Sequence, residues 1–316
     1  MIEALGWCLL ALLMLALGGD SVLKGASGLS RRFGVPPFVA GLLLVAFGTS
    51  IPELAVNAHA FVVGSQSLAL GNAVGSNIVN FGLTLGLAAI AAPLVVRWRA
   101  LAPLLICLIA ATIALIAFGF DGVLTRIEGL VFVLAFLAVL AVAVVLSRRE
   151  VPELREEITG FLRTGDGLGL NALRFAVGGA LLYFGALWLV RHAPVLGAGW
   201  HLSPLLTGLI VVAIATALPE AVAAVAAARR GQGDMVVGHV VGSSVFNLLI
   251  VVGGMAALRD LPIPASFVGF ELPAALAASL LLYPMLRKDL QISRPEGWVL
   301  LLAFVAWVAF ELLLSK

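Results

Sequence analysis

Ten apolar stretches, each about as long as a bilayer-spanning helix, occupy most of this 316-residue chain. They lie near residues 4–29, 36–62, 67–92, 101–119, 126–146, 171–191, 203–228, 234–257, 265–286 and 296–314. A helix needs about 20 mainly apolar residues to cross the hydrocarbon core. Only 11% of the residues are charged and 62% are hydrophobic, so the chain lacks the polar surface of a soluble domain. The sequence therefore predicts an all-α integral membrane protein with ten transmembrane helices.

Basic residues separate by side in the short connections between these stretches. The connections after spans one, three, five, seven and nine contain Arg31, Arg32, Arg97, Arg99, Arg148, Arg149, Arg155, Arg163, Arg229, Arg230, Arg287, Lys288 and Arg294. The other side has Arg126, Arg191, Arg259 and Lys316. Because positive loops stay in the cytoplasm, we expect a multi-pass protein of the cell (inner) membrane with both termini outside. The connection 147–170 is then a cytoplasmic linker. A formal net charge of +2 is too small to produce the strong positive field of a nucleic-acid-binding protein.

The chain contains an internal repeat. When the chain is aligned with itself, Pro37–Asn80 falls without a gap on Pro204–Asn247. The identities gather on polar and helix-breaking residues, where Gly48–Glu53 falls on Ala215–Glu220 and Gly71–Asn80 falls on Gly238–Asn247. Five spans separate equivalent points, so the second copy should cross the membrane in the opposite direction. We therefore expect two inverted-topology five-helix repeats, 1–146 with motif 37–80 and 171–316 with motif 204–247, and a binding site at the midplane where they meet.

Each copy of the motif places one glutamate well inside a predicted span, Glu53 in the first and Glu220 in the second. A charged side chain at the bilayer centre costs about 2.5–3.5 kcal/mol on insertion scales, and such residues usually serve function. Two unpaired carboxylates brought together would repel, and one would tend to take up a proton. The matching blocks of the two motifs, Gly48–Glu53 with Gly71–Asn80 and Ala215–Glu220 with Gly238–Asn247, contain no Lys or Arg. A bound cation is therefore the natural counter-charge.

Oxygen donors surround both glutamates in the sequence. Thr49 and Ser50 precede Glu53 by four and three residues, and Thr216 precedes Glu220 by four, so a helix places them on one face. The same spacing of four joins Ser76 to Asn80 and Ser243 to Asn247. Hard cations such as Ca²⁺ take oxygen ligands of this kind, whereas softer metals would call for Cys or His. Pro52 and Pro219 lack an N–H and so free the carbonyls of Gly48 and Ala215.

These motifs resemble the two alpha-repeats of the calcium/cation antiporter superfamily, and in particular those of prokaryotic sodium/calcium exchangers. The resemblance implies that the cation is bound by Glu53, Glu220, Thr49, Ser50, Thr216, Ser76, Ser243, Asn80 and Asn247. It also implies backbone carbonyl ligands seven residues before each glutamate, at Ala46 and Ala213. By the same resemblance, the first and sixth spans slide across a compact bundle and so alternate access to the site.

The second copy departs from the family pattern. Ala215 and Ala217 stand where Gly and Ser are usual, so one hydroxyl is missing. His239 replaces the usual Asn, and Asn247 occupies a position that some relatives fill with Asp. These changes leave the coupling ion and the stoichiometry open.

The resulting hypothesis is a secondary active antiporter that exchanges Ca²⁺ for Na⁺ by alternating access at a two-glutamate site. The alternatives are a calcium/proton antiporter and a non-transporting homologue. A membrane enzyme is not expected, because no nucleophile or zinc set accompanies the two acids. The predicted partners are Ca²⁺ and Na⁺, with protons as the alternative, and the lipid bilayer. We predict that the protein uses no cofactor, and the sequence leaves its oligomeric state open.

Overall fold

The computed structural model describes residues 1–32, 50–96, 98–147 and 167–314. Within this part of the chain, eight helices are long and apolar enough to cross a membrane. They correspond to all the predicted spans except the second and the fifth. The fifth is the 22-residue helix α7 (Arg126–Ser147), about 33 Å long at 1.5 Å per residue. Of the second, the structure describes only α3 (Ile51–Val62), so the count of ten remains a prediction.

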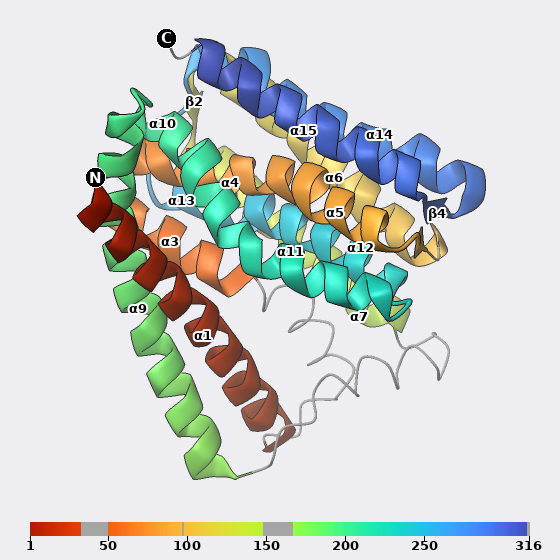
Figure 1. The fold of residues 1–316 in the computed structure, drawn as a ribbon, viewed down its shortest axis with the longest axis horizontal. Coiled ribbons are helices and arrows are strands. Elements are labelled where there is room, and N and C mark those ends of the chain that lie inside the picture. The colour runs from red at the N-terminus through yellow and green to blue at the C-terminus, as the bar shows by residue number, and fades with distance from the viewer. Residues whose placement is uncertain (33–49, 97, 148–166, 315–316) are drawn as a thin grey trace.

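The first half of the chain contains α1 (Ile2–Arg32), α3, α4 (Gln66–Val79), η2 (Asn80–Thr84), α5 (Leu85–Ala91), β1 (Leu94–Val95), α6 (Trp98–Phe118), η3 (Gly119–Asp121), β2 (Val123–Leu124) and α7. The second half contains α9 (Leu168–Gly199), α10 (Pro204–Leu206), η4 (Thr207–Val212), α11 (Ala213–Arg229), α12 (Gly233–Phe246), η5 (Asn247–Val252), α13 (Gly253–Leu258), β3 (Leu261–Pro262), η6 (Phe267–Glu271), α14 (Leu272–Asp289), β4 (Gln291–Ile292) and α15 (Arg294–Leu314). Helices thus account for nearly all of the described structure, with two short strand pairs between them (Figure 1).

The elements of the second half follow those of the first at a nearly constant interval, the one that separates the two motif copies. Helix α4 begins at Gln66 and ends at Val79, and these positions align with Gly233 and Phe246, where α12 begins and ends. The next segments, η2 and η5, begin at the aligned Asn80 and Asn247. The starts of α7 and α15 are one residue further apart than this interval. The interval found in the motifs therefore extends through both halves.

The two strand pairs follow the same relation. Strand β1 pairs with β4, and β2 pairs with β3, both antiparallel. The registers are Leu94 with Ile292 and Val95 with Gln291 in one pair, and Leu261 with Leu124 and Pro262 with Val123 in the other. Strand β1 corresponds to β3 at the motif interval, and β2 corresponds to β4 at an interval one residue longer. With these shifts the register of the first pair becomes that of the second. Each pair joins one strand from each half and fastens the halves together at its end of the bundle.

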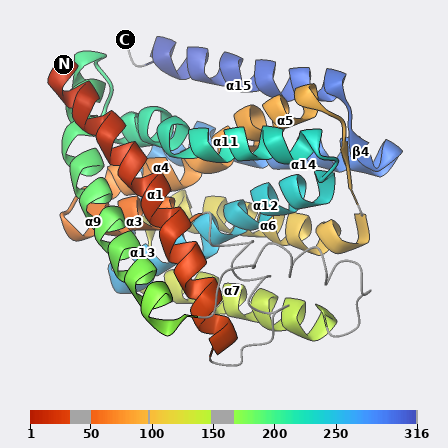
Figure 2. The same cartoon turned by 60° about the horizontal axis from the view of Figure 1, so that its bottom comes forward.

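Helices α1 and α9 lie side by side and cross the rest of the bundle obliquely (Figures 1 and 2). They contain 31 and 32 residues, so the predicted limits 4–29 and 171–191 were too short. At 1.5 Å per residue each is about 46–48 Å long, which exceeds the hydrocarbon core and requires tilt or extension beyond it. Glycines allow the close contact: a Cβ at Gly18 would lie 2.9 Å from the Gly178 carbonyl oxygen. A Cβ at Gly185 would lie 3.0 Å from that of Ala11.

The centre of the bundle is formed by α4 with α5 and by α12 with α13. In the apolar 18-residue stretch of these two spans, 83% and 78% of the residues are buried. In the other spans that meet the length and hydropathy requirement the buried share is at most 50%, so much of their surface faces outward. Backbone approaches through glycine are closest here. A Cβ at Gly71 or Gly75 would lie 2.2 Å from the carbonyl oxygen of Leu205 or Leu209. These two motif glycines therefore let α4 pack closely on α10 and η4.

Candidate functional site

The structure describes all but two of the predicted ligands; Thr49 and Ala46 lie outside the described residues. The described ligands are all buried, and they come from four different parts of the fold. Helix α3 and the residue before it supply Ser50 and Glu53. The remaining three groups come from α11 (Ala213, Thr216, Glu220), from α4 with η2 (Ser76, Asn80) and from α12 with η5 (Ser243, Asn247).

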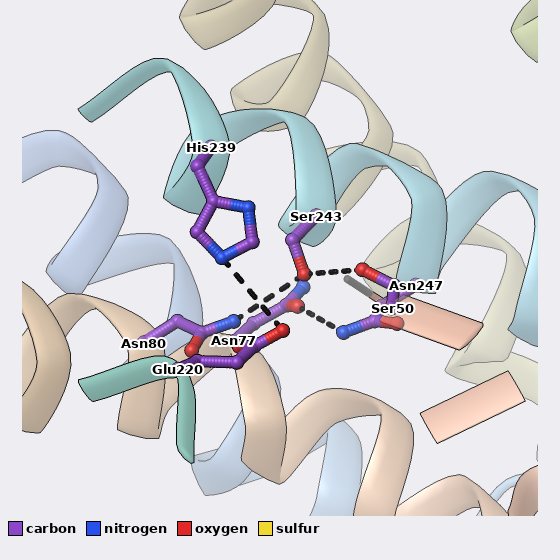
Figure 3. A network of polar contacts seen from close by, with 7 residues as sticks. All are labelled: Ser50, Asn77, Asn80, Glu220, His239, Ser243 and Asn247. Atoms are coloured by element: carbon purple, nitrogen blue, oxygen red, sulfur yellow. Dashed lines mark hydrogen bonds and ion pairs between the residues drawn. The ribbon is translucent and has the colours of Figure 1, made fainter. Parts of the chain in front are cut away.

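Three of these four groups meet at the Ser243 hydroxyl (Figure 3). Ser50 is the N-cap residue of α3, where a serine usually bonds to the helix backbone. Its hydroxyl makes no capping bond and instead lies 2.7 Å from Ser243 Oγ. The amide Nδ2 of Asn80 donates to the same Ser243 oxygen over 3.5 Å. Three residues that are up to 193 positions apart in sequence are thus gathered at one point.

The two motif glutamates are buried close together. Glu53 is 2% exposed and Glu220 is 9% exposed. Glu53 lies within Coulombic range of Glu220, and the Thr216 side chain lies beside Glu53. The Nε2 of His239 lies 3.7 Å from Glu220 Oε1, a contact that places this unusual motif residue at the site (Figure 3). The two carboxylates therefore lie close together inside the bundle.

Several buried oxygens around these glutamates accept no hydrogen bond from the part of the chain that the structure describes. They are Glu53 Oε2, both carboxylate oxygens of Glu220, Ser76 Oγ, Asn80 Oδ1 and Asn247 Oδ1. Buried polar atoms in proteins nearly always have a partner, so such a group of unsatisfied acceptors indicates a place for a cation. Among the described residues, no group of three or more His, Cys, Asp or Glu could hold a metal ion. A cation here would therefore rely on two carboxylates and neutral amide and hydroxyl oxygens.

The two asparagines predicted as ligands, Asn80 and Asn247, stand where an α-helix widens into a π-helix. Asn80 opens η2, and Asn247 opens η5. A π-helical turn shifts the backbone hydrogen bonds from i−4 to i−5, and such turns occur frequently at functional sites. A third π-helical segment, η4, ends immediately before Ala213. The predicted ligands Asn80, Asn247 and Ala213 are thus all placed at changes of helical geometry.

The Thr216 hydroxyl already has a backbone partner. Its Oγ1 donates to the carbonyl of Val212 over 3.0 Å and to that of Ala213 over 3.3 Å. The donor capacity of this hydroxyl is thereby used, and its lone pairs remain to face a cation. The Ala213 carbonyl keeps a second lone pair for the same purpose.

Three further buried asparagines of the first motif were not predicted to take part in polar contacts. Asn77 donates to the Ser244 carbonyl over 3.2 Å and accepts from Asn247 Nδ2 over 3.2 Å, which joins the two motif helices. Asn72 donates to Asn57 Oδ1 over 2.9 Å. Asn57 stands one turn after Glu53, on the same face of α3, and this spacing was the available signal. Asn77 aligns with Ser244 rather than with another asparagine, so the repeat did not mark it.

A cavity of about 230 Å³ lies between α1 and α11 and reaches the site. Its lining includes Glu220 and Thr216 on one side and Asp20 of α1 on the other. Asp20 forms an exposed ion pair with Lys24 over 2.6 Å, one helical turn further along α1. The cavity therefore connects one of the two buried glutamates to a charged pair on the oblique helix.

Comparison with known proteins assigns the family. The family described as sodium/calcium exchanger protein matches residues 3–145 and 170–313. The chain is 33% identical over 312 residues to the putative antiporter CaxA of Alkalimonas amylolytica, covering 97% of this chain and 98% of that protein. It is 31% identical over 323 residues to the inner membrane protein YrbG of Escherichia coli strain K12, covering 100% and 98%. A structure of the sodium-calcium exchanger NCX_Mj soaked with Na⁺ and Sr²⁺ has a TM-score of 0.67 and 28% identity, with 98% of both chains covered.

The chain belongs to the sodium/calcium exchanger family. The resemblance to the calcium/cation antiporter superfamily, which rested on two repeated motifs, is confirmed by matches that span both halves. Family and fold together define a multi-pass membrane protein of the cation antiporter class.

Proposed function

We propose that this antiporter exchanges Ca²⁺ for Na⁺ at a single site whose charge comes from Glu53 and Glu220. The observation that carries the proposal is the pair of buried carboxylates, of which Glu53 Oε2 and both Glu220 oxygens accept no hydrogen bond from the described residues. Their two negative charges balance one Ca²⁺ or two Na⁺. Neutral oxygens of Ser76, Asn80 and Asn247 complete the kind of ligand set that Ca²⁺ prefers. Structures of the NCX_Mj relative were solved after soaking with Na⁺ and Ca²⁺ or with Na⁺ and Sr²⁺, which supports Ca²⁺ and Na⁺ as substrates.

We propose further that 1–146 and 171–316 are inverted-topology repeats joined by the linker 147–170. The constant interval between corresponding elements and the interchangeable strand registers support equivalence of the two halves. Each half has five spans, and because five is an odd number the second copy crosses the membrane in the opposite direction. The site residues come from both halves, as expected when a binding site lies where two repeats meet.

Alternating access would arise from movement of the α1–α9 pair. These two long helices pack chiefly on each other, and α1 forms one wall of the cavity that reaches Glu220. Sliding of this pair along the compact α4–α12 core would close the cavity on one side of the membrane. The glycine contacts between α1 and α9 would keep the two helices together as one moving unit.

An ion-flux assay in proteoliposomes tests the exchange. Vesicles loaded with Ca²⁺ should release it when an external Na⁺ gradient is imposed. A proton gradient without Na⁺ should not drive the release. Release by the proton gradient alone would favour the calcium/proton antiporter, and absence of release under both gradients would identify a non-transporting homologue.

The proposed orientation, with both termini outside and the linker in the cytoplasm, is tested by cysteine labelling. Single cysteines introduced near Arg31, Arg155 or Arg230 should react only with reagents that reach the cytoplasm. A cysteine beside Lys316 should react from outside, because ten spans return the chain to its starting side. Labelling of the two chain ends from opposite sides would contradict the ten-span plan.

The alanine at position 217 has a predictable effect on Na⁺ binding. In the alignment of the two motif copies, Ala217 corresponds to Ser50, and Ser76 corresponds to Ser243. The Ser50 and Ser243 hydroxyls lie 2.7 Å apart, whereas Ser76 Oγ has no hydrogen-bond partner among the described residues and Ala217 is fully buried. In the second pair, Ser76 therefore keeps its hydroxyl and Ala217 supplies none. The site has one neutral oxygen fewer for binding cations.

Ala217→Ser should restore that oxygen and lower the Na⁺ concentration that half-saturates exchange. A hydrogen bond to a charged group contributes about 1.5–3 kcal/mol, so a shift of several-fold or more is expected. Ca²⁺ binding should change less, since it depends mainly on Glu53 and Glu220. Ala226→Ser, the same substitution on an exposed position of α11, is the matched control. An Na⁺ dependence unchanged in Ala217→Ser would count against the idea that this alanine limits coupling.

A further inference from the structure

A second pair of buried glutamates lies away from the proposed calcium site. Glu271 is the last residue of η6, and Glu311 lies in the last turn of α15. They are 4% and 3% exposed. Glu271 corresponds to Leu104 under the motif interval, and Glu311 corresponds to Ala143 under the interval that is one residue longer between α7 and α15, so this pair exists in one half only. Symmetry of the transport site therefore does not explain it.

The two side chains lie near each other in an apolar setting. Glu271 is close enough to Glu311 for their charges to repel. Next to each acid in sequence stands a phenylalanine, and the rings of Phe270 and Phe310 are in contact at 4.8 Å between centroids. Glu271 Oε2 and Glu311 Oε1 accept no hydrogen bond from the described residues. Two ionised carboxylates in this position would lack both hydration and a counter-charge.

A third polar group, the indole N–H of Trp307, lies beside this pair. Trp307 precedes Glu311 by one helical turn and is more than nine-tenths buried. Its indole N–H lies beside the Glu311 carboxylate, short of full hydrogen-bond geometry, and has no other partner among the described residues. An N–H donor in this position stabilises one negative charge, not two.

No positive charge reaches this pair from the described parts of the elements around it. Helices α4 and α5 and segment η2 contain no ionisable residue. Arg287 on α14 and Arg294 on α15 stand at the opposite ends of their helices, about 24 Å away at 1.5 Å per residue. Nearby η3 carries Asp121, which already accepts from the Val123 N–H. On α6, Cys107 is neutral, and Arg99 lies at the far end, among the side chains that are not described.

The chemistry of the pair selects its ligand. A metal cation needs several oxygen ligands, typically about six to eight for Ca²⁺, and two carboxylates beside an N–H donor and phenyl rings do not supply them. A proton needs only two acceptors. Taken from water, it would sit on one carboxyl group, whose O–H then donates to the other carboxylate. The pair would carry one negative charge, which the Trp307 N–H can stabilise.

We propose that Glu271 and Glu311 form a proton-binding site, separate from the calcium site, in which one shared proton holds α15 against η6 and α14. The consequence extends to the transport core, because α15 packs closely on η2 and α5. A Cβ at Gly82 would lie 2.3 Å from Phe304 Cβ, and Gly86 and Gly297 make a similar contact. Loss of the proton would leave two repelling charges in the crevice and loosen α15 from the segment that begins with Asn80.

Infrared spectroscopy tests the site without any transport measurement. In a Glu53→Gln/Glu220→Gln variant the calcium-site carboxyls are absent, so a remaining protonated-carboxyl band that shifts in D₂O must come from elsewhere. We expect this band at about one carboxyl per molecule, unchanged by the control Glu3→Gln at an exposed position. Adding either Glu271→Gln or Glu311→Gln should abolish it. Absence of the band in the starting variant, or its survival in both added variants, would overturn the proposal.

Thermal unfolding of the otherwise unchanged chain gives an independent measurement. The unfolding midpoint of the wild type should fall as the pH is raised, because the shared proton is lost from the folded state. Glu271→Gln and Glu311→Gln should each remove this alkaline loss, since one neutral amide then donates to the remaining carboxylate permanently. Both variants losing stability with pH as the wild type does would exclude the pair as the proton site. Neither measurement depends on the identity of the transported ions.

Discussion

Replacement of Glu53 or Glu220 by glutamine is expected to abolish calcium exchange while the protein remains inserted and folded. Each substitution keeps the size of the side chain and removes one of the two charges that balance Ca²⁺. Removing one partner of a buried charge interaction costs about 2–5 kcal/mol, so Ca²⁺ should bind on the order of 30-fold more weakly or worse. Isotopic Ca²⁺ uptake into proteoliposomes, together with equilibrium Ca²⁺ binding to the purified protein, measures both effects.

The control for these variants is Glu3→Gln, which makes the same change at an exposed position. It should transport as the wild type does. Unfolding midpoints of the two site variants should stay at or above that of the wild type, because each removes a repelling charge from a buried pair. Wild-type calcium flux in either site variant would show that the two glutamates do not form the transport site.

The residues that the sequence marked most strongly are the ones that the structure brings together. Asn80 and Ser243 were chosen because polar identities recur at one spacing inside apolar spans, and Ser50 was chosen because it precedes Glu53 by three residues. These three residues meet within hydrogen-bonding distance. This worked because a polar residue in a membrane span is costly and is retained mainly where it serves a site. The span predictions rested on the equally simple requirement for about 20 apolar residues.

Other features depend on contacts between elements, which a single sequence does not display. The π-helical turns at Asn80 and Asn247 have no compositional signal, since the residues around them are ordinary helix formers in a membrane. The extended ends of α1 and α9 continue past the most apolar region because the two helices pack on each other. The Asn77 bridge to Asn247 joins residues 170 positions apart whose pairing appears only in three dimensions.

The two halves share one backbone plan but differ in the polar groups that it presents. Asn72 bonds to Asn57, whereas its counterpart His239 contacts Glu220. Ser243 has a hydroxyl partner, and its counterpart Ser76 has none among the described residues. Backbone equivalence therefore sets where ligands can stand, while the side chains determine which ions bind and how tightly. Such an asymmetric site can bind Ca²⁺ through its two carboxylates and still differ from its relatives in the coupling ion.

Gly75→Ala is expected to be among the most damaging small substitutions in the chain. An added Cβ would lie 2.2 Å from the Leu209 carbonyl oxygen, 2.7 Å from its Cα and 2.8 Å from its carbonyl carbon. These are backbone atoms, so α4 and η4 would have to separate by at least about 0.8 Å to reach a tolerable 3.0 Å. Overpacking of this kind typically costs about 1–3 kcal/mol. The separation would also displace Ser76, the next residue, away from the half of the site that follows η4.

The measurement is the unfolding midpoint of the purified protein, followed by equilibrium Ca²⁺ binding to the fraction that remains folded. Both should fall in Gly75→Ala. Gly179→Ala is the matched control, because Gly179 is exposed on α9 and its added Cβ would meet no described atom within 4 Å. That substitution should be neutral or stabilising by roughly 0.5–1 kcal/mol, as alanine favours a helix over glycine. If the two variants match in midpoint and in Ca²⁺ affinity, the close approach of α4 to η4 does not hold the site together.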